Sequence, residues 1–126
     1  MPEKAKILVV EDEPSLRLLV RKVLERSGFE VLEAASGVAA LELWDQGKPH
    51  VDLLLTDKVM PDGMSGRQLA ERLKADNPDL KVLYTSGYST ELLGKDLALQ
   101  EGTNFLQKPY PPSKLVETVR NALSLI

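Results

Sequence analysis

Acidic residues follow two of the apolar runs in this sequence, and their types suit metal and phosphoryl chemistry. Glu11 and Asp12 come directly after Ile7–Val10, and Asp57 comes after Leu53–Thr56. Hard divalent cations bind carboxylate oxygens, and Mg²⁺ in particular accepts one or two carboxylates while leaving room for phosphate oxygens. A carboxylate held on a rigid strand can also act as a nucleophile that forms an aspartyl phosphate. Asp57 is therefore a candidate nucleophile.

Two later runs also end in polar residues. Ser86 and Gly87 follow the fourth apolar run, and Lys108 follows the fifth. A serine hydroxyl can donate to a phosphoryl oxygen, and a lysine supplies a compact positive charge. Each of these residues alone is more often an ordinary turn or surface residue. Their placement after successive runs is what favours a shared site.

The runs themselves predict five buried strands. Their apolar residues are continuous rather than alternating, which is typical of strands that are covered on both faces. The runs are Ile7–Val10, Val31–Leu32, Val51–Leu55, Leu80–Tyr84 and Phe105–Leu106.

Helical periodicity fills the intervals between the runs. We expect helices from Pro14 to near Gly28, from Ser36 to near Gly47, from about Ser65 to Asp76, around Ser89–Leu99, and from Pro111 to the chain end. The first has an apolar stripe of Leu16, Leu19, Val20, Val23 and Leu24, and the second has Val38, Leu41 and Trp44. The fourth is the weakest, because Gly94 in its middle costs about 1 kcal/mol relative to Ala.

Five strands that are each followed by a helix favour parallel pairing through right-handed crossovers, and hence an open α/β sandwich. Such sheets bind ligands beyond the carboxyl ends of their strands. If the strands lie in the order 2-1-3-4-5, the first and third are neighbours about 4.8 Å apart, and Glu11, Asp12 and Asp57 crowd together. Their mutual repulsion would be relieved by a cation, so the sequence predicts a Mg²⁺ site there.

Composition limits the classes of function. We expect one domain, residues 1–126, because 126 residues leave no room for a second core of ordinary size, and no separate output domain accompanies it. The absence of Cys excludes a disulfide framework and thiolate chemistry. A net charge of -3 without a basic run speaks against direct nucleic-acid binding. No apolar stretch approaches the roughly 20 residues of a bilayer span, so we expect a soluble, cytoplasmic domain without direct membrane contact.

Over essentially its whole length, the chain resembles the receiver domain of bacterial two-component response regulators. The resemblance is carried by Ile7–Glu13, Leu55–Asp57, Met60–Gly66, Ser86–Gly87 and Phe105–Pro109. It implies a doubly wound (βα)5 flavodoxin-like sandwich with a five-stranded parallel sheet in the order 2-1-3-4-5. The sequences of Tyr84–Tyr88 and Phe105–Tyr110 are most similar to those of receivers at the C-terminal end of hybrid sensor histidine kinases. A stand-alone regulator is the alternative.

Residue roles follow from the resemblance. Asp57 matches the phosphoacceptor. The residues that match the ligands of Mg²⁺, or alternatively Mn²⁺, are Glu11, Asp12, Asp57 and Val59, the last through its backbone carbonyl. The residues matched to phosphoryl contact and conformational switching are Ser86 (switch hydroxyl), Phe105 (switch aromatic) and Lys108 (phosphoryl contact). Since Phe105 lacks the hydroxyl of a tyrosine, a switch there would be a packing change.

The resemblance also implies a signalling function rather than an enzyme. A phosphohistidine on a histidine kinase or histidine phosphotransfer domain would donate its phosphoryl group to Asp57. The signal would then pass to a downstream protein or to another domain of a parent chain, which could be a hybrid histidine kinase. The receiver would promote its own phosphorylation and dephosphorylation. A homodimer through the fourth-helix to fifth-helix face is a further possibility within the family.

Competing functions fit the residues less well. A haloacid-dehalogenase-like phosphatase needs a second Asp two residues after the nucleophile, where this chain has Val59. A flavodoxin-like flavin carrier needs a phosphate-cradling loop after the first strand, where Glu11–Glu13 would repel phosphate. Neither Gly47–Lys48 nor Gly94–Lys95 completes the phosphate loop of a nucleotide hydrolase. A receiver-like module that only docks to partners would not need the acidic, hydroxyl and lysine residues that are present.

Overall fold

The computed structural model describes residues 5–47, 51–57, 66–86, 105–107 and 110–123. Strands and helices alternate along the chain. The strands are β1 (Lys6–Val10), β2 (Glu30–Ala34), β3 (Leu53–Asp57), β4 (Lys81–Ser86) and β5 (Phe105–Gln107). The helices are α1 (Pro14–Arg26), α2 (Gly37–Gly47), α3 (Gly66–Asp76) and α5 (Pro112–Ala122). The predicted fourth helix, around 89–99, lies outside the described residues.

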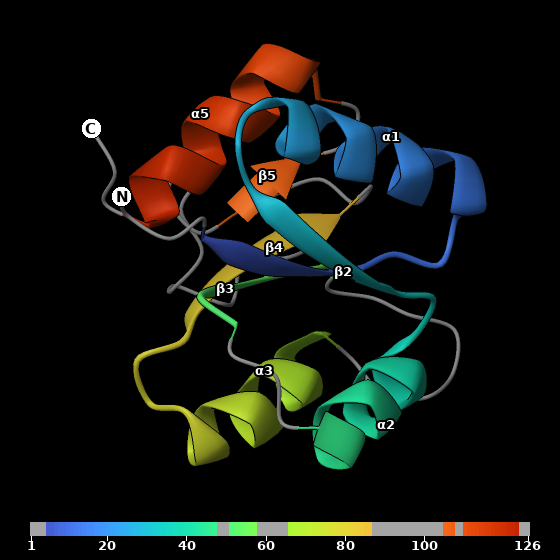
Figure 1. Cartoon of the computed structure of the whole chain (residues 1–126), viewed down its shortest axis with the longest axis vertical. Coiled ribbons are helices and arrows are strands. Elements are labelled where there is room, and N and C mark those ends of the chain that lie inside the picture. The colour runs from blue at the N-terminus through green and yellow to red at the C-terminus, as the bar shows by residue number, and fades with distance from the viewer. Residues whose placement is uncertain (1–4, 48–50, 58–65, 87–104, 108–109, 124–126) are drawn as a thin grey trace.

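The five strands form one parallel sheet in the order β2-β1-β3-β4-β5, which confirms the predicted topology (Figure 1). Val10 near the end of β1 pairs with Ala34 of β2 and with Thr56 of β3. In the same way, Asp57 pairs with Thr85 of β4. The register therefore brings the carboxyl ends of neighbouring strands to one edge of the sheet.

Helices cover both faces of the sheet. α1 and α5 lie on one face, and α2 and α3 lie on the other (Figure 1). Each face has its own apolar core. Ile7 and Val9 of β1 pack with residues of α1 and α5, whereas Leu8 and Val10 pack with residues of α2 and α3. Because successive strand residues point to opposite faces, only a continuous apolar run can serve both cores, as the sequence predicted.

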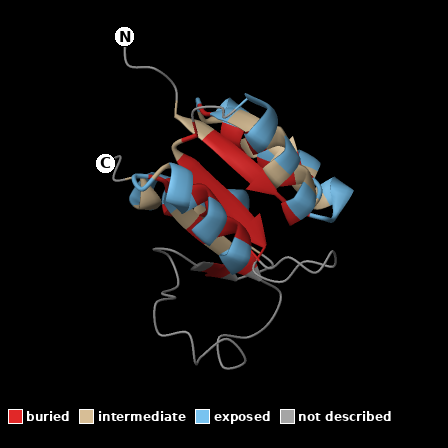
Figure 2. Cartoon of the chain, turned by 90° about the horizontal axis from the view of Figure 1, so that it is seen from below, coloured by how far each residue is buried: buried red, intermediate tan, exposed pale blue. Residues whose placement is uncertain are grey.

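Burial follows this layered arrangement. Figure 2 shows buried strands enclosed by helices whose outer surfaces are exposed.

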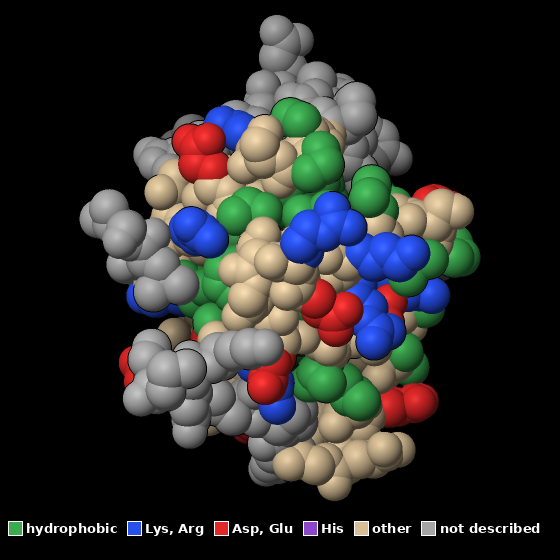
Figure 3. Space-filling view, turned by 45° about the horizontal axis from the view of Figure 1, so that its top comes forward, with side chains coloured by type: hydrophobic (Ala, Val, Ile, Leu, Met, Phe, Trp, Pro, Cys, Tyr) green, Lys and Arg blue, Asp and Glu red, His purple; other side chains and the backbone are tan. Residues whose placement is uncertain are grey.

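On the face over α1 and α5, Lys and Arg side chains lie among acidic and apolar ones (Figure 3). Several of these basic side chains are paired with acidic ones, as Arg17 and Arg21 are with Glu33.

Local sequence signals set the ends of α1. Glu13 caps its start, where the side chain accepts hydrogen bonds from the backbone N–H groups of Ser15 (3.3 Å) and Leu16 (2.7 Å). Pro14 occupies the first helical position, where the N–H that proline lacks is not needed. After the helix, Gly28 has a φ of 96°, the left-handed conformation that glycine adopts without a steric penalty.

Two residues of the predicted apolar stripes are exposed rather than buried. Leu19 of α1 has 50% of its surface exposed, and Val38 of α2 has 45%. Each lies at the margin of its stripe, because α1 faces the sheet through Val20 and Leu24, and α2 faces it mainly through Ala40 and Trp44. Helix α5 ends at Ala122, slightly before the predicted end, although Leu123 still packs against the core.

Candidate functional site

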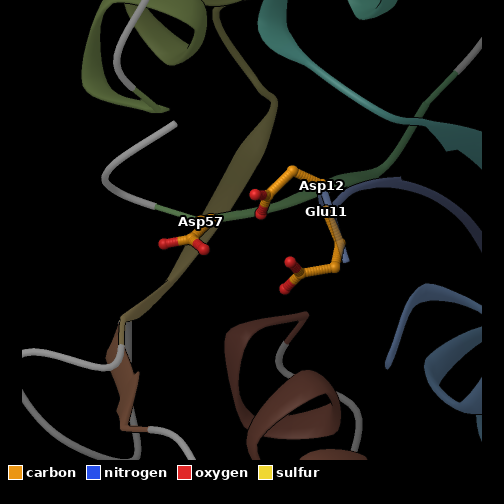
Figure 4. Close-up of side chains that lie close together, drawn as sticks. All are labelled: Glu11, Asp12 and Asp57. Atoms are coloured by element: carbon orange, nitrogen blue, oxygen red, sulfur yellow. The ribbon is translucent and has the colours of Figure 1, made fainter. Parts of the chain in front are cut away.

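Three carboxylates meet at the carboxyl edge of the sheet. Glu11 and Asp12 follow the last residue of β1, and Asp57 is the last residue of the neighbouring β3. One carboxylate oxygen from each residue lies within 4.8 Å of the other two (Figure 4). Glu11 and Asp57 are buried, with 4% and 8% of their surfaces exposed, while Asp12 is exposed. The predicted acidic cluster is therefore present, with one member facing solvent.

Asp57 is held by a strand that is buried along its whole length. β3 lies between β1 and β4, and Asp57 pairs with Thr85 of β4. The hydroxyl of Thr56 donates to the backbone carbonyl of Asp57 at 3.1 Å. A carboxylate on such a support keeps its position, which suits a group that must meet a reaction partner in a defined geometry.

Gly66 contributes to the site in a way that sequence reasoning missed. It is the buried first residue of α3 and packs against the backbone of Asp57. A Cβ at this position would overlap the carbonyl oxygen of Asp57 and would approach its carbonyl carbon and Thr56 Cγ2, each at 3.1 Å. The glycine at the end of the Met60–Gly66 motif was the available signal, but only the packing shows what it contacts.

The turn between β1 and α1 is tied down at several points. The N–H of Glu11 donates to the carbonyl of Ala34 in β2 at 3.1 Å. The carboxylate of Glu11 accepts a hydrogen bond from the N–H of Glu13 at 3.1 Å. Arg17 donates from Nη1 to the carbonyl oxygen of Glu11 at 2.8 Å, a contact that the sequence pattern did not indicate. These bonds fix the backbone that carries two of the three carboxylates.

The donor set of this cluster fits a hard divalent cation. Three carboxylate groups that lie this close repel one another, and a cation bound among them relieves that repulsion. All three residues supply oxygen ligands, which Mg²⁺ and similar ions prefer, and the exposed Asp12 leaves one side open to solvent. Glu11, Asp12 and Asp57 could therefore hold a metal ion.

The other predicted site residues are only partly within the described structure. Ser86 ends β4 and pairs with Gln107, and Phe105 begins β5 and pairs with Tyr84. Ser86 therefore lies on β4, the neighbour of β3, and Phe105 lies on β5, one strand further out. The side chains of both residues lie outside the described structure. Val59 and Lys108 also lie outside the described residues.

Comparison with known proteins identifies the family. A family model described as the response regulator receiver domain matches residues 7–120. The chain belongs to this family. The predicted resemblance is thus confirmed over nearly all of the sequence.

Similar receivers occur both inside long kinases and as small separate proteins. The chain is 37% identical to sensor kinase CckA of Brucella abortus (strain 2308) over 94% of its own length but only 12% of that protein. It is 35% identical to the response regulator receiver protein CpdR of the same organism, over 94% of this chain and 96% of that protein. A solved receiver domain from hybrid histidine kinase CckA superimposes with a TM-score of 0.77 at 34% identity, covering 94% of this chain and 99% of that one.

Family membership establishes the general function. Receiver domains are phosphoacceptors in two-component phosphorelays, and this receiver domain belongs to a signalling family that is broadly non-enzymatic. Receiver domains interact with histidine kinases or phosphotransfer proteins, and some form part of hybrid kinases. Among the described residues, no helix has the length and apolar character needed to cross a membrane.

Proposed function

We propose that Asp57 is the phosphoacceptor of this receiver domain and that it works with a divalent metal ion at the acidic cluster. The observation that carries this proposal is the position of Asp57 at the end of a buried strand, with its carboxylate within 4.8 Å of those of Glu11 and Asp12. Mg²⁺ is the proposed ion and Mn²⁺ an alternative, held by these three side chains and the backbone carbonyl of Val59.

Phosphoryl transfer begins with a carboxylate oxygen of Asp57 attacking the phosphorus of a phosphohistidine. A P–O bond forms as the P–N bond breaks and the electron pair of that bond stays on the ring nitrogen. The ring, protonated at its other nitrogen, leaves as neutral imidazole, and Asp57 becomes an acyl phosphate. A metal ion held by Glu11, Asp12 and Asp57 would supply positive charge that offsets the negative charge of the phosphoryl oxygens. Lys108 would pair with the same oxygens, and the hydroxyl of Ser86 would donate a hydrogen bond to one of them. The same groups allow the domain to promote its own phosphorylation and dephosphorylation.

The proposed output is a change in a protein-interaction surface. Ser86 and Phe105 belong to strands β4 and β5, so a rearrangement at the phosphoryl group would reach the surface next to α5. Phosphoryl donors would be a histidine kinase or a histidine phosphotransfer domain. The phosphorylated domain would pass its signal to another protein. If residues 1–126 are the single receiver domain of a longer hybrid kinase, it would pass the signal to another domain of that chain. Dimerisation would use the face between the fourth and fifth helices, and the proposed location is the cytoplasm, without direct contact to nucleic acid or membrane.

Intact-mass spectrometry after incubation with Mg²⁺ and acetyl phosphate tests the phosphoacceptor. We expect wild type to gain one phosphoryl group that hydroxylamine removes, as it removes acyl phosphates, and we expect Asp57→Asn to gain none. Asp52→Asn is the matched control, because Asp52 precedes the same strand at the opposite edge and accepts a hydrogen bond from the N–H of Lys6 at 2.9 Å. This control keeps an oxygen for that bond and should be phosphorylated like wild type.

Three results would overturn the proposal. Equal labelling of wild type and Asp57→Asn would place the phosphoryl group on another residue. Unchanged labelling after EDTA treatment would show that the reaction needs no metal ion. A wild type that is never labelled would favour a receiver-like module that acts by docking alone.

A further inference from the structure

Arg17 lies in α1 and reaches back toward the acidic cluster. Its Nη1 atom donates to the backbone carbonyl of the buried Glu11 at 2.8 Å, which is a short, charge-assisted hydrogen bond. We propose that Arg17 is a positioning residue, which holds the turn from Glu11 to Glu13 so that the carboxylates of Glu11 and Asp12 face Asp57. The inference rests on the proposed metal site and adds a residue to it that touches neither metal nor phosphoryl group.

The geometry of the turn explains why this bond matters. The N–H of Glu11 is held by Ala34 of β2, and its carboxylate accepts from the N–H of Glu13. The carbonyl of Glu13 in turn accepts from the N–H of Arg17 at 2.9 Å. Arg17 therefore bonds to both ends of the turn: its backbone N–H donates to the carbonyl of Glu13, and its side chain donates to the carbonyl of Glu11. Rotation of the Glu11–Asp12 peptide would break the side-chain bond and would move Asp12.

A second acidic residue keeps the Arg17 side chain in place. Glu33 of β2 pairs with Arg17 through one carboxylate oxygen (Nε to Oε1, 3.6 Å) and with Arg21 through the other (Nη1 to Oε2, 2.7 Å). The side chain of Arg17 is 22% exposed, compared with 44% for Arg21. The planar guanidinium can make both contacts at once, because its N–H groups point in different directions, toward the carbonyl of Glu11 and the carboxylate of Glu33.

Arg21 provides a natural control on the same helix. It has the same charge and the same partner Glu33, and it also pairs with Glu25 at 3.4 Å. Its side-chain hydrogen bond to Glu33, followed by the negative charge of Glu25, raises the pKa of Arg21, so it stays cationic at any working pH. Within the described structure, the hydrogen bonds and ion pairs of the Arg21 side chain go to Glu25 and Glu33, and none reaches the Glu11–Glu13 turn.

Positioning and simple electrostatics predict opposite effects of removing Arg17. A positive charge near a cation site repels the cation, so its removal alone would tighten metal binding. If Arg17 instead positions the ligands, its removal weakens binding although the repulsion has gone. The sign of the change therefore distinguishes the two roles.

The test is a Mg²⁺ titration followed by amide chemical shifts in NMR, with wild type, Arg17→Met, Arg17→Lys and Arg21→Met. We expect the Kd for Mg²⁺ to rise about tenfold in Arg17→Met, the size typical of residues that orient metal ligands. Arg21→Met should stay within about twofold of wild type, as expected for an exposed ion pair. Arg17→Lys keeps the charge but loses the planar fork, so its Kd should lie between those of wild type and Arg17→Met.

A measurement without metal adds an independent readout. The N–H of Glu13 donates to the carboxylate of Glu11, so its hydrogen exchange should be faster in Arg17→Met than in Arg21→Met. If Arg17→Met fails to fold, Arg17→Lys is compared with Arg21→Met in both measurements instead.

The outcomes separate the inference from the proposed function. Unchanged or tighter Mg²⁺ binding in both Arg17 variants would overturn the positioning role while leaving the metal site intact. Equal weakening in Arg17→Met and Arg21→Met would also overturn it, because the cause would then be the shared partner Glu33. A wild type that binds no Mg²⁺ would overturn the metal site and the inference together.

Discussion

The contact between Gly66 and Asp57 makes Gly66→Ala a demanding test of the structure. Gly66 has no positive φ, so alanine can adopt its backbone conformation, and any effect must come from the space that the methyl group needs. The added Cβ would overlap the carbonyl oxygen of Asp57 and would lie 3.1 Å from its carbonyl carbon. These neighbours are backbone atoms of a central strand and cannot rotate away, so either β3 or the start of α3 must move.

The size of the effect follows from two opposing contributions. Overpacking a well-packed region typically costs about 1–3 kcal/mol of unfolding free energy. Alanine recovers roughly 0.5–1 kcal/mol relative to glycine in a helix. Because the overlap is with backbone atoms of Asp57, the overpacking cost falls in the upper half of its range, and we expect Gly66→Ala to lose about 1–2 kcal/mol of stability. For a domain of this size, that loss lowers the Tm by roughly 3–10 °C.

Gly47→Ala is the matched control. Gly47 is the last residue of α2, and a Cβ added there meets no atom of the described residues within 4 Å. The same substitution should therefore be neutral, or stabilising by up to about 1 kcal/mol, because alanine restricts the unfolded chain.

Urea unfolding measured by far-UV circular dichroism compares the two variants, and acetyl phosphate labelling of the folded proteins measures the site. Since Asp57 must shift in Gly66→Ala, its labelling rate should fall about tenfold or more, in line with the sensitivity of reactions to small misplacements. Gly47→Ala should be labelled at the wild-type rate. If Gly66→Ala were as stable as Gly47→Ala and were labelled equally fast, the inferred packing against Asp57 would be wrong.

Three further predictions follow from other parts of the structure. Gly28→Ala should cost about 1–2 kcal/mol of stability in urea unfolding without changing Mg²⁺ affinity, because its φ of 96° is unfavourable for a residue with a Cβ; an unchanged unfolding midpoint would contradict this. Trp44→Phe should cost about 1–2 kcal/mol by the same assay, since it removes the hydrogen bond from Nε1 to Asp76 (2.8 Å) but leaves that carboxylate paired with Arg72 (3.0 Å); a loss well above that range would show that more than this bond depends on the indole. Mg²⁺ at about 100 times its Kd should stabilise wild type by about 2.7 kcal/mol, seen as a rise in Tm that EDTA reverses; the same rise in Asp12→Asn would exclude Asp12 as a ligand.

Much of the fold could be predicted from the sequence because local patterns report on burial. Continuous apolar runs such as Ile7–Val10 indicated strands covered on both faces, and the structure places successive residues of that run in different cores. The alternation of strands and helices predicted parallel pairing, whereas the strand order came from the family resemblance. The helical period predicted burial less well. Leu19 and Val38 match it but are exposed, because they lie at the margins of their stripes, where packing decides exposure.

Some features of the site could likewise be predicted from the sequence, and others are visible only in the structure. By itself, the sequence determined which chemistry is available, because the residue types that follow the strands are written in it: carboxylates at Glu11, Asp12 and Asp57 suit a cation. Only the tertiary structure decided what holds them. The contact of Gly66 with Asp57 and the bond from Arg17 to Glu11 depend on where two helices pass the edge of the sheet. No periodicity records such contacts, because each joins one backbone group to one neighbour through the relative placement of whole elements.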